Sequence, residues 1–120
     1  MKGVLIIAHG SRRESTVDTM DYITGLVREK LLEVPIVSSY MEFAYPSVLE
    51  GLEQLRSKGV TDIIAVPYFL FEGIHIKKDI PGELEKFRLA NPEITVNMVG
   101  TLGKDRRLAE ILSERIKEAL

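Results

Sequence analysis

The chain alternates between short apolar runs and longer stretches in which apolar residues recur every three or four positions. Short runs rich in β-branched and aromatic residues are typical of buried strands, whereas the longer spacing is typical of amphipathic helices. We therefore expect four strands, at 4–8, 36–43, 61–70 and 94–99. Helices are expected at about 15–32, 46–58, 79–90 and 105–119.

Residues that start and stop helices support these boundaries. Ser15 and Asp18 resemble a capping box, and Pro46 lies where a first helical turn begins. Other expected caps and stops are Gly59, Asp79, Pro81, Asn91 and Asp105. Pro67 conflicts with a regular central strand because proline has no N–H to donate, so we expect a bulge or the end of pairing there.

This alternating order predicts an α/β fold with an open, mainly parallel four-stranded sheet and helices on both faces. With a flavodoxin-like strand order 2-1-3-4, the order reverses between the first and third strands. Ligands bind such sheets beyond the carboxyl ends of the strands, at the reversal. His9 follows the first strand, His75 lies in a loop after the third, and Glu42 is near the end of the second.

Length and composition limit the architecture. With 120 residues, 45% of them hydrophobic and 28% charged, residues 1–120 are expected to form one domain. The chain is too short for two lobes, so a deep cleft would need a second copy as its other wall.

Composition also limits location and partners. There is no apolar run long enough to span a membrane and no signal-peptide pattern, so we expect a cytoplasmic protein without a membrane partner. The absence of cysteine excludes disulfides and thiolate chemistry. Nucleic-acid-binding proteins usually carry a basic surface, and the formal net charge of −2 does not indicate one.

The two histidines and Glu42 carry the candidate chemistry. Together they could bind a borderline cation such as Co²⁺, Ni²⁺, Fe²⁺ or Zn²⁺ and accept protons near neutral pH. The alternative is that each histidine is a hydrogen-bonded structural residue at a strand end. Both histidines of the chain lie in loops at the predicted reversal of strand order, which favours the functional interpretation.

A second interpretation is phosphate binding or nucleophilic catalysis at His9-Gly10-Ser11. Gly10 would allow close backbone approach, but no phosphate-loop motif or nucleophile elbow is present, which favours a turn role for Ser11. Positive charge flanks the histidines at Arg12-Arg13 and Lys77-Lys78, either for an anionic ligand or as solvated surface. Phe69, Phe71 and Ile74 are candidates for an apolar wall or for the core.

Four segments resemble the small sirohydrochlorin cobaltochelatases of the class II chelatase superfamily. These are VLIIAHGSR, MEFAYPSV, VPYFLFEGIHIKKDIP and GTLGKD, which occur in the family's order across almost the whole chain. The resemblance implies a chelatase-type α/β fold that inserts a divalent metal into sirohydrochlorin without a nucleotide. No cofactor beyond the metal substrate is implied, with cobalt first and nickel or iron as alternatives.

The resemblance also implies roles for individual residues. His9 and His75 would bind the metal and accept protons, and Glu42 would be their acidic partner. Residues expected to contact the macrocycle are Gly10, Ser11, Arg12, Gly73, Ile74, Lys77 and Lys78. Short family members act as homodimers. A noncatalytic tetrapyrrole or metal carrier using the same histidines remains an alternative, and the lack of a histidine-rich C-terminal extension weighs against metal storage.

Overall fold

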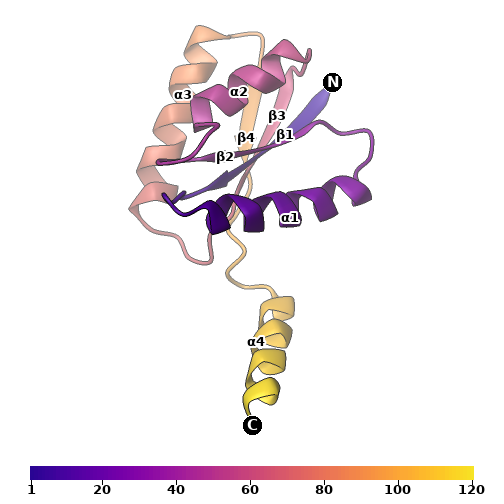
Figure 1. The fold of residues 1–120 in the computed structure, drawn as a ribbon. Helices are drawn as coiled ribbons and strands as arrows, with labels where there is room; N and C mark the ends of the chain where they lie inside the picture. The colour runs from indigo at the N-terminus through magenta and orange to yellow at the C-terminus, as the bar shows by residue number, and fades with distance from the viewer.

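A four-stranded parallel sheet forms the centre of the computed structural model, which describes residues 1–120 (Figure 1). Its strands are β1 (Lys2–Ala8), β2 (Ile36–Tyr40), β3 (Asp62–Pro67) and β4 (Thr95–Met98). They lie in the order β2-β1-β3-β4, and all three pairings are parallel. The predicted order 2-1-3-4 is confirmed, so the carboxyl ends of β1 and β3 are neighbours.

Helices pack on both faces of the sheet, as predicted. The helical segments are α1 (Glu14–Lys30), α2 (Val48–Ser57), η1 (His75–Asp79), α3 (Ile80–Ala90) and α4 (Arg106–Ala119). The larger core lies between the sheet and α2 and α3, around Leu52, Ile63 and Phe87. A smaller cluster beneath α1 contains Met20 and Tyr40. No helix combines the length and apolar character needed to cross a bilayer.

Two strands end three residues earlier than the hydrophobic pattern predicts. Residues 36–43 were expected to form one strand, but β2 ends at Tyr40 and Phe43 has a φ of 65°, which is incompatible with a strand. The third strand ends at Pro67, where the missing N–H predicts the end of pairing. The Tyr68 N–H still donates to the Ile7 carbonyl at 2.7 Å, so the two segments stay together past the strand's end.

Helix starts were predicted with mixed success. The capping box at Ser15 and Asp18 is wrong, because α1 already begins at Glu14 and its N-cap makes no side-chain hydrogen bond. The structure instead has a capping box formed by Ser47 and Glu50, which places Pro46 just before the N-cap of α2 rather than in its first turn.

Later boundaries agree better with prediction. Gly59 follows α2 with a φ of 88°, and the Asp105 side chain accepts a hydrogen bond from the Arg107 N–H at the start of α4. Asn91 follows α3 as expected. Asp79, however, is no N-cap, because helical backbone already begins several residues earlier, in η1.

Candidate active site

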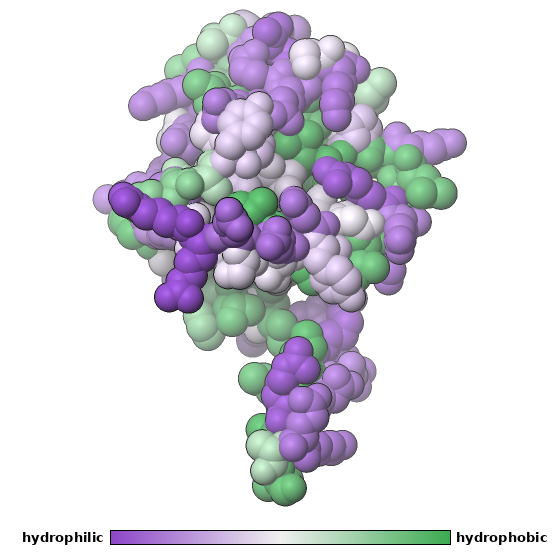
Figure 2. All heavy atoms as spheres, viewed as in Figure 1, coloured by the Kyte–Doolittle hydropathy of each residue, from purple (hydrophilic) through white to green (hydrophobic).

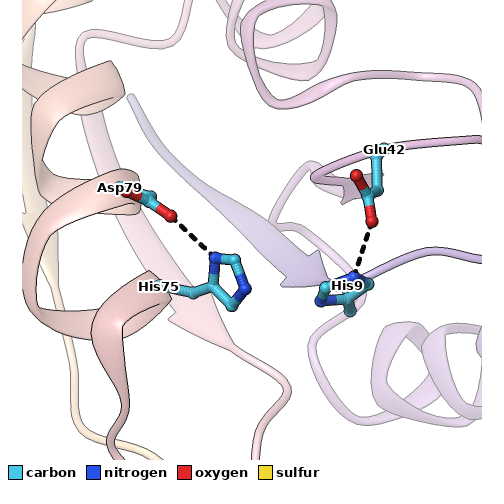
Figure 3. A network of polar contacts seen from close by, with 4 residues as sticks. All are labelled: His9, Glu42, His75 and Asp79. Atoms are coloured by element: carbon cyan, nitrogen blue, oxygen red, sulfur yellow. Dashed lines mark hydrogen bonds and ion pairs between the residues drawn. The ribbon is translucent and has the colours of Figure 1, made fainter.

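His9 and His75 meet at the carboxyl edge of the sheet, where β1 and β3 are neighbours (Figure 3). Their ring centroids are 5.2 Å apart, and the ring planes make an angle of 78°. Each ring also contacts a carboxylate, Glu42 for His9 and Asp79 for His75. The structure therefore brings together two histidine–carboxylate pairs from three separate stretches of chain.

Glu42 is held beside His9 by backbone hydrogen bonds as well as by its side chain. Beyond β2, the Met41 N–H donates to the Ala8 carbonyl at 2.9 Å and the Glu42 N–H donates to the His9 carbonyl at 3.1 Å. The Glu42 Oε1 then lies 2.8 Å from His9 Nε2. Since the main chain fixes both residues, the side-chain contact needs little further ordering.

Gly10 makes this close approach feasible. Its φ of +100° is a conformation that side chains rarely adopt, and a Cβ at this position would lie 2.0 Å from the Glu42 carbonyl oxygen. Only glycine satisfies both conditions without moving the loop after β2. Gly10 therefore sets the distance between His9 and Glu42 through the backbone.

His75 lies on a helical segment, which corrects the expectation that it lies in a loop. The Lys77 N–H donates to the Gly73 carbonyl at 3.0 Å, so helical turns begin at Gly73. His75 then opens the π-helical turn η1, in which the Ile80 N–H bonds to the His75 carbonyl. Buried Ile76 and Ile80 anchor this segment in the core, and π-helical turns are frequent at functional sites.

Asp79 is the site residue that sequence reasoning missed. Its Oδ2 lies 2.7 Å from His75 Nδ1, one helical turn along the same segment. The spacing of four residues between His75 and Asp79 was the available signal, because such residues face one another on a helix. The pattern hides this signal because it predicts a loop at His75 and a helix cap at Asp79.

The carboxylates decide which ring nitrogens are free. An ionised carboxylate only accepts hydrogen bonds, so beside it a neutral ring carries its proton on Nε2 in His9 and on Nδ1 in His75. The lone pairs are then on Nδ1 of His9 and Nε2 of His75. These four side chains remain between 42% and 50% exposed, so a large ligand can reach them.

The arrangement can hold a metal ion only loosely. No group of three or more histidine, cysteine, aspartate or glutamate side chains is placed to enclose a cation. Imidazole suits Co²⁺, Ni²⁺, Fe²⁺ and Zn²⁺. Two imidazoles at this edge leave most coordination positions to other ligands. This arrangement suits a metal ion that is passed on to another ligand better than one that is stored.

The basic residues predicted around the site differ in their surroundings. The Arg12 guanidinium lies 4.6 Å from the centre of the Phe43 ring, a cation–π contact with the residue that follows Glu42 in the chain. Lys77 and Lys78 are exposed on η1. Ser11 accepts a hydrogen bond from the Arg13 N–H, which is the predicted turn role.

Apolar residues near the site divide between core and surface. Phe69 packs against the larger core, whereas Phe71 and Ile74 are exposed. A shallow hollow beside His9 is lined mainly by hydroxyl-bearing residues, among them Ser15, Thr19 and Tyr68. The edge therefore offers separate apolar and polar surfaces beside the two histidines.

Comparison with known proteins identifies the family. A model of the CbiX family matches residues 3–119. The chain belongs to the CbiX family. A sirohydrochlorin cobaltochelatase of Sulfurisphaera tokodaii is 36% identical over 120 residues, covering 100% of this chain and 95% of the relative.

Two further relatives extend the comparison. A crystal structure of a cobalamin (vitamin B12) biosynthesis CbiX protein from Marinobacter aquaeolei matches with a TM-score of 0.83 and 27% identity, covering 99% of this chain and 97% of that one. A sirohydrochlorin ferrochelatase of Priestia megaterium is 36% identical, covering 98% of this chain but 44% of the relative. The chain thus spans less than half of that longer protein.

Proposed function

We propose that this protein is a sirohydrochlorin chelatase that inserts a divalent metal ion, cobalt in the first place, into the macrocycle. The observation that carries the proposal is the pair of imidazoles, each oriented by its own carboxylate, at one open edge of a CbiX fold. Full-length similarity to a cobaltochelatase supports cobalt. Iron is the alternative supported by the ferrochelatase relative, and nickel follows from ligand chemistry alone.

Two lone pairs at this edge would serve two needs of the reaction. The metal must be held above the ring while it loses water, which favours few protein ligands and open coordination positions. Insertion also releases two pyrrole N–H protons, and a positioned base typically contributes about 10²- to 10⁴-fold. His9 Nδ1 and His75 Nε2 would act as metal ligands before insertion and as proton acceptors during it.

The two carboxylates would support both roles. A carboxylate that accepts the second ring N–H of a histidine fixes the orientation of the ring and raises its basicity as a ligand. Glu42 and Asp79 make this contact in the structure. Each also stabilises the imidazolium that forms when its histidine takes up a pyrrole proton.

Charged and apolar residues around the histidines would bind the macrocycle. Its carboxylate side chains need cationic or N–H partners, for which Arg12, Lys77 and Lys78 are available. Exposed Phe43 and Ile74 offer apolar surface for the ring. Gly10, Ser11 and Gly73 would contribute backbone groups.

We further propose that the enzyme works as a homodimer. Ligand sites usually bury about 70–90% of a ligand's surface, and the half-exposed histidines of one copy cannot enclose a macrocycle. A second copy facing the same edge would provide the other wall. A cytoplasmic location stays a prediction from the sequence.

Absorption spectroscopy tests the activity directly. Purified protein mixed with sirohydrochlorin and Co²⁺, Ni²⁺ or Fe²⁺ is expected to convert the macrocycle spectrum faster than the spontaneous reaction, most strongly with Co²⁺. No acceleration with any of the three metals would contradict the proposal. Tight binding of sirohydrochlorin without acceleration would identify a carrier instead.

Two variants separate the chemistry within that assay. His75→Ala should abolish most insertion while circular dichroism shows an intact fold. Ser11→Ala removes one hydroxyl that bonds only to the local turn, so its insertion rate should stay near that of the parent protein. Loss of activity in Ser11→Ala together with full activity in His75→Ala would favour chemistry at Ser11 over metal insertion.

A further inference from the structure

Phe43 combines two features that are unfavourable in the free protein. It is the only residue other than glycine with a positive φ, of 65°, a conformation that bulky side chains rarely adopt. Its side chain is 55% exposed and belongs to neither core cluster, so the fold itself gains little from the ring. Strained residues gather at ligand-binding and catalytic sites, and this outlier therefore points to a function.

The short loop that contains Phe43 is fixed on both sides of this residue. Before it, the Glu42 N–H donates to the His9 carbonyl at 3.1 Å. After it, the chain returns to the end of β2, where the Tyr40 N–H donates to the Pro46 carbonyl at 2.9 Å. These bonds hold position 43 in a conformation that glycine would adopt without strain.

Arg12 is the partner of the Phe43 ring. Its guanidinium carbon lies 4.6 Å from the ring centre. Figure 2 shows strongly hydrophilic side chains projecting from the surface where α1 begins, just after Arg12 in the chain. Arg12 forms no ion pair, in contrast to Arg56, Arg88 and Arg107. It is therefore a charge that is held in place but not neutralised.

The contact with the ring prepares Arg12 to bind a carboxylate. A guanidinium stacked on an aromatic ring keeps the donors at its edge free, in a planar fork that matches the two oxygens of a carboxylate. Because the stacking already restricts the side chain, less conformational freedom is lost on binding. Lys77 and Lys78, the other cations near the histidines, are exposed on η1 and act as point charges. Arg12 is the cation with a set direction.

The pair formed by Arg12 and Phe43 lies beside the histidines. Arg12 is in the loop that follows His9, and Phe43 directly follows Glu42, whose Oε1 lies 2.8 Å from His9 Nε2. A macrocycle bound with its metal-binding centre at the histidines must place its rim over the residues that surround them. The carboxylate arms of sirohydrochlorin are attached to that rim, so the pair is placed to meet one of them.

We propose that Arg12 and Phe43 act as one binding unit that determines specificity for sirohydrochlorin. The Phe43 ring packs against the rim of the macrocycle and holds Arg12, which binds a carboxylate arm of the same rim. The inference deepens the chelatase function proposed above and rests on it. The unit selects a macrocycle with an acidic arm at this position and aligns its centre with His9 and His75. Contact with the macrocycle offsets the backbone strain that the free protein carries at Phe43.

Titration of the metal-free protein with sirohydrochlorin, followed by absorption, measures this unit separately from metal insertion. Arg12→Gln should raise Kd about 10-fold, the lower end for a charge-assisted hydrogen bond because the site is exposed. Arg12→Lys should bind almost as weakly, since an ammonium lacks the planar fork. Arg13→Gln is the matched control, because this neighbouring arginine has no aromatic contact, and it should keep the parent Kd. Equal losses at both arginines, or a parent-like Kd in Arg12→Lys, would overturn the unit.

A double-mutant cycle in the same titration tests whether the two residues act together. Phe43→Leu keeps an apolar side chain but removes the aromatic face on which Arg12 is held. Arg12→Gln then has less binding left to remove, so the loss in the double variant should be at least about threefold smaller than the product of the two single losses. Single losses that simply multiply would show two independent contacts and overturn the unit.

Glycine and alanine at position 43 separate a role in binding from a role in folding. Both Phe43→Gly and Phe43→Ala remove the ring, but only glycine adopts the positive φ without strain, so Phe43→Gly should unfold at a higher temperature than Phe43→Ala. Both variants should nevertheless bind sirohydrochlorin equally weakly. Binding that recovers with stability in Phe43→Gly would show that Phe43 acts only through the fold and would overturn the unit.

Insertion kinetics separate failure of this unit from failure of the proposed function. In the insertion assay Arg12→Gln and Phe43→Gly should raise KM with kcat near the parent value, because contacts at the rim act on binding. Insertion with a parent KM in both variants would overturn the unit alone. The expected changes in Kd without any metal insertion by the parent protein would support the unit and contradict the chelatase. Light scattering should give Phe43→Gly the parent mass, and a smaller mass would assign Phe43 to a contact between copies and overturn the unit.

Discussion

Replacement of Gly10 by alanine is the most direct test of how the site is held. The new Cβ would lie 2.0 Å from the Glu42 carbonyl oxygen, whereas real Cβ contacts are essentially never under 3.0 Å. His9 and Glu42 must then separate by at least about 1 Å, a displacement that can cost on the order of 10²-fold in rate. The positive φ adds a backbone cost of roughly 1–2 kcal/mol to the folded state.

Gly59→Ala is the matched control. Gly59 also has a positive φ, of +88°, but no atom lies within 4 Å of a Cβ built there. It precedes β3 and so lies at the opposite end of the sheet from the histidines. Both variants share the backbone cost, and only Gly10→Ala adds the steric clash.

The assay combines initial rates of cobalt insertion with thermal unfolding. Both variants should unfold at lower temperature than the parent protein. Per folded molecule, Gly59→Ala should keep the parent rate and Gly10→Ala should lose about 10²-fold. A folded Gly10→Ala protein with the parent rate would refute the idea that the His9–Glu42 distance governs the chemistry.

Three further predictions concern single side chains. Asp79→Ala should lower kcat/KM for insertion by about 10-fold, the lower end of the usual effect of a ligand's hydrogen-bond partner, because the pair is half-exposed. Asp79→Asn keeps an acceptor for the His75 ring N–H but no charge to stabilise the imidazolium, so it should retain more activity than Asp79→Ala and less than the parent protein. Partial desolvation of the Glu83 carboxyl raises its pKa, with Lys86 opposing and the Asp79 charge adding, so the ionised form is less favourable in the folded state than in the unfolded state. Glu83→Gln should therefore be more stable than the parent protein at pH 7 in thermal unfolding, with the advantage fading as the pH falls through the raised pKa; an equal difference at every pH would contradict this. The Tyr40 hydroxyl is buried without a hydrogen-bond partner, so Tyr40→Phe should leave the free energy of unfolding unchanged or increase it. Chemical denaturation measures this free energy, and a loss above about 1 kcal/mol would be inconsistent with that environment.

The sequence by itself determined the layout of the sheet and the edge that carries the chemistry. Apolar periodicity distinguishes strands from helices because side chains repeat every two residues in a strand and about every 3.6 in a helix. Parallel strands joined by right-handed crossovers then bring the carboxyl ends of β1, β2 and β3 to one edge. The sequence alone therefore places His9, Glu42 and His75 at that edge.

Tertiary structure decided which atoms meet there. The contact between His75 and Asp79 depends on η1, which forms because Ile76 and Ile80 are buried in the core. The close approach of Gly10 to the Glu42 carbonyl, which leaves only 2.0 Å for a Cβ, depends on the return of the loop after β2 to β1. Helix α4 shows the same limit. Its own periodicity predicts the helix and its apolar face, but its direction follows from linker contacts with the loop after β3. Local pattern fixes an element and its faces, whereas its neighbours depend on packing between residues far apart in the chain.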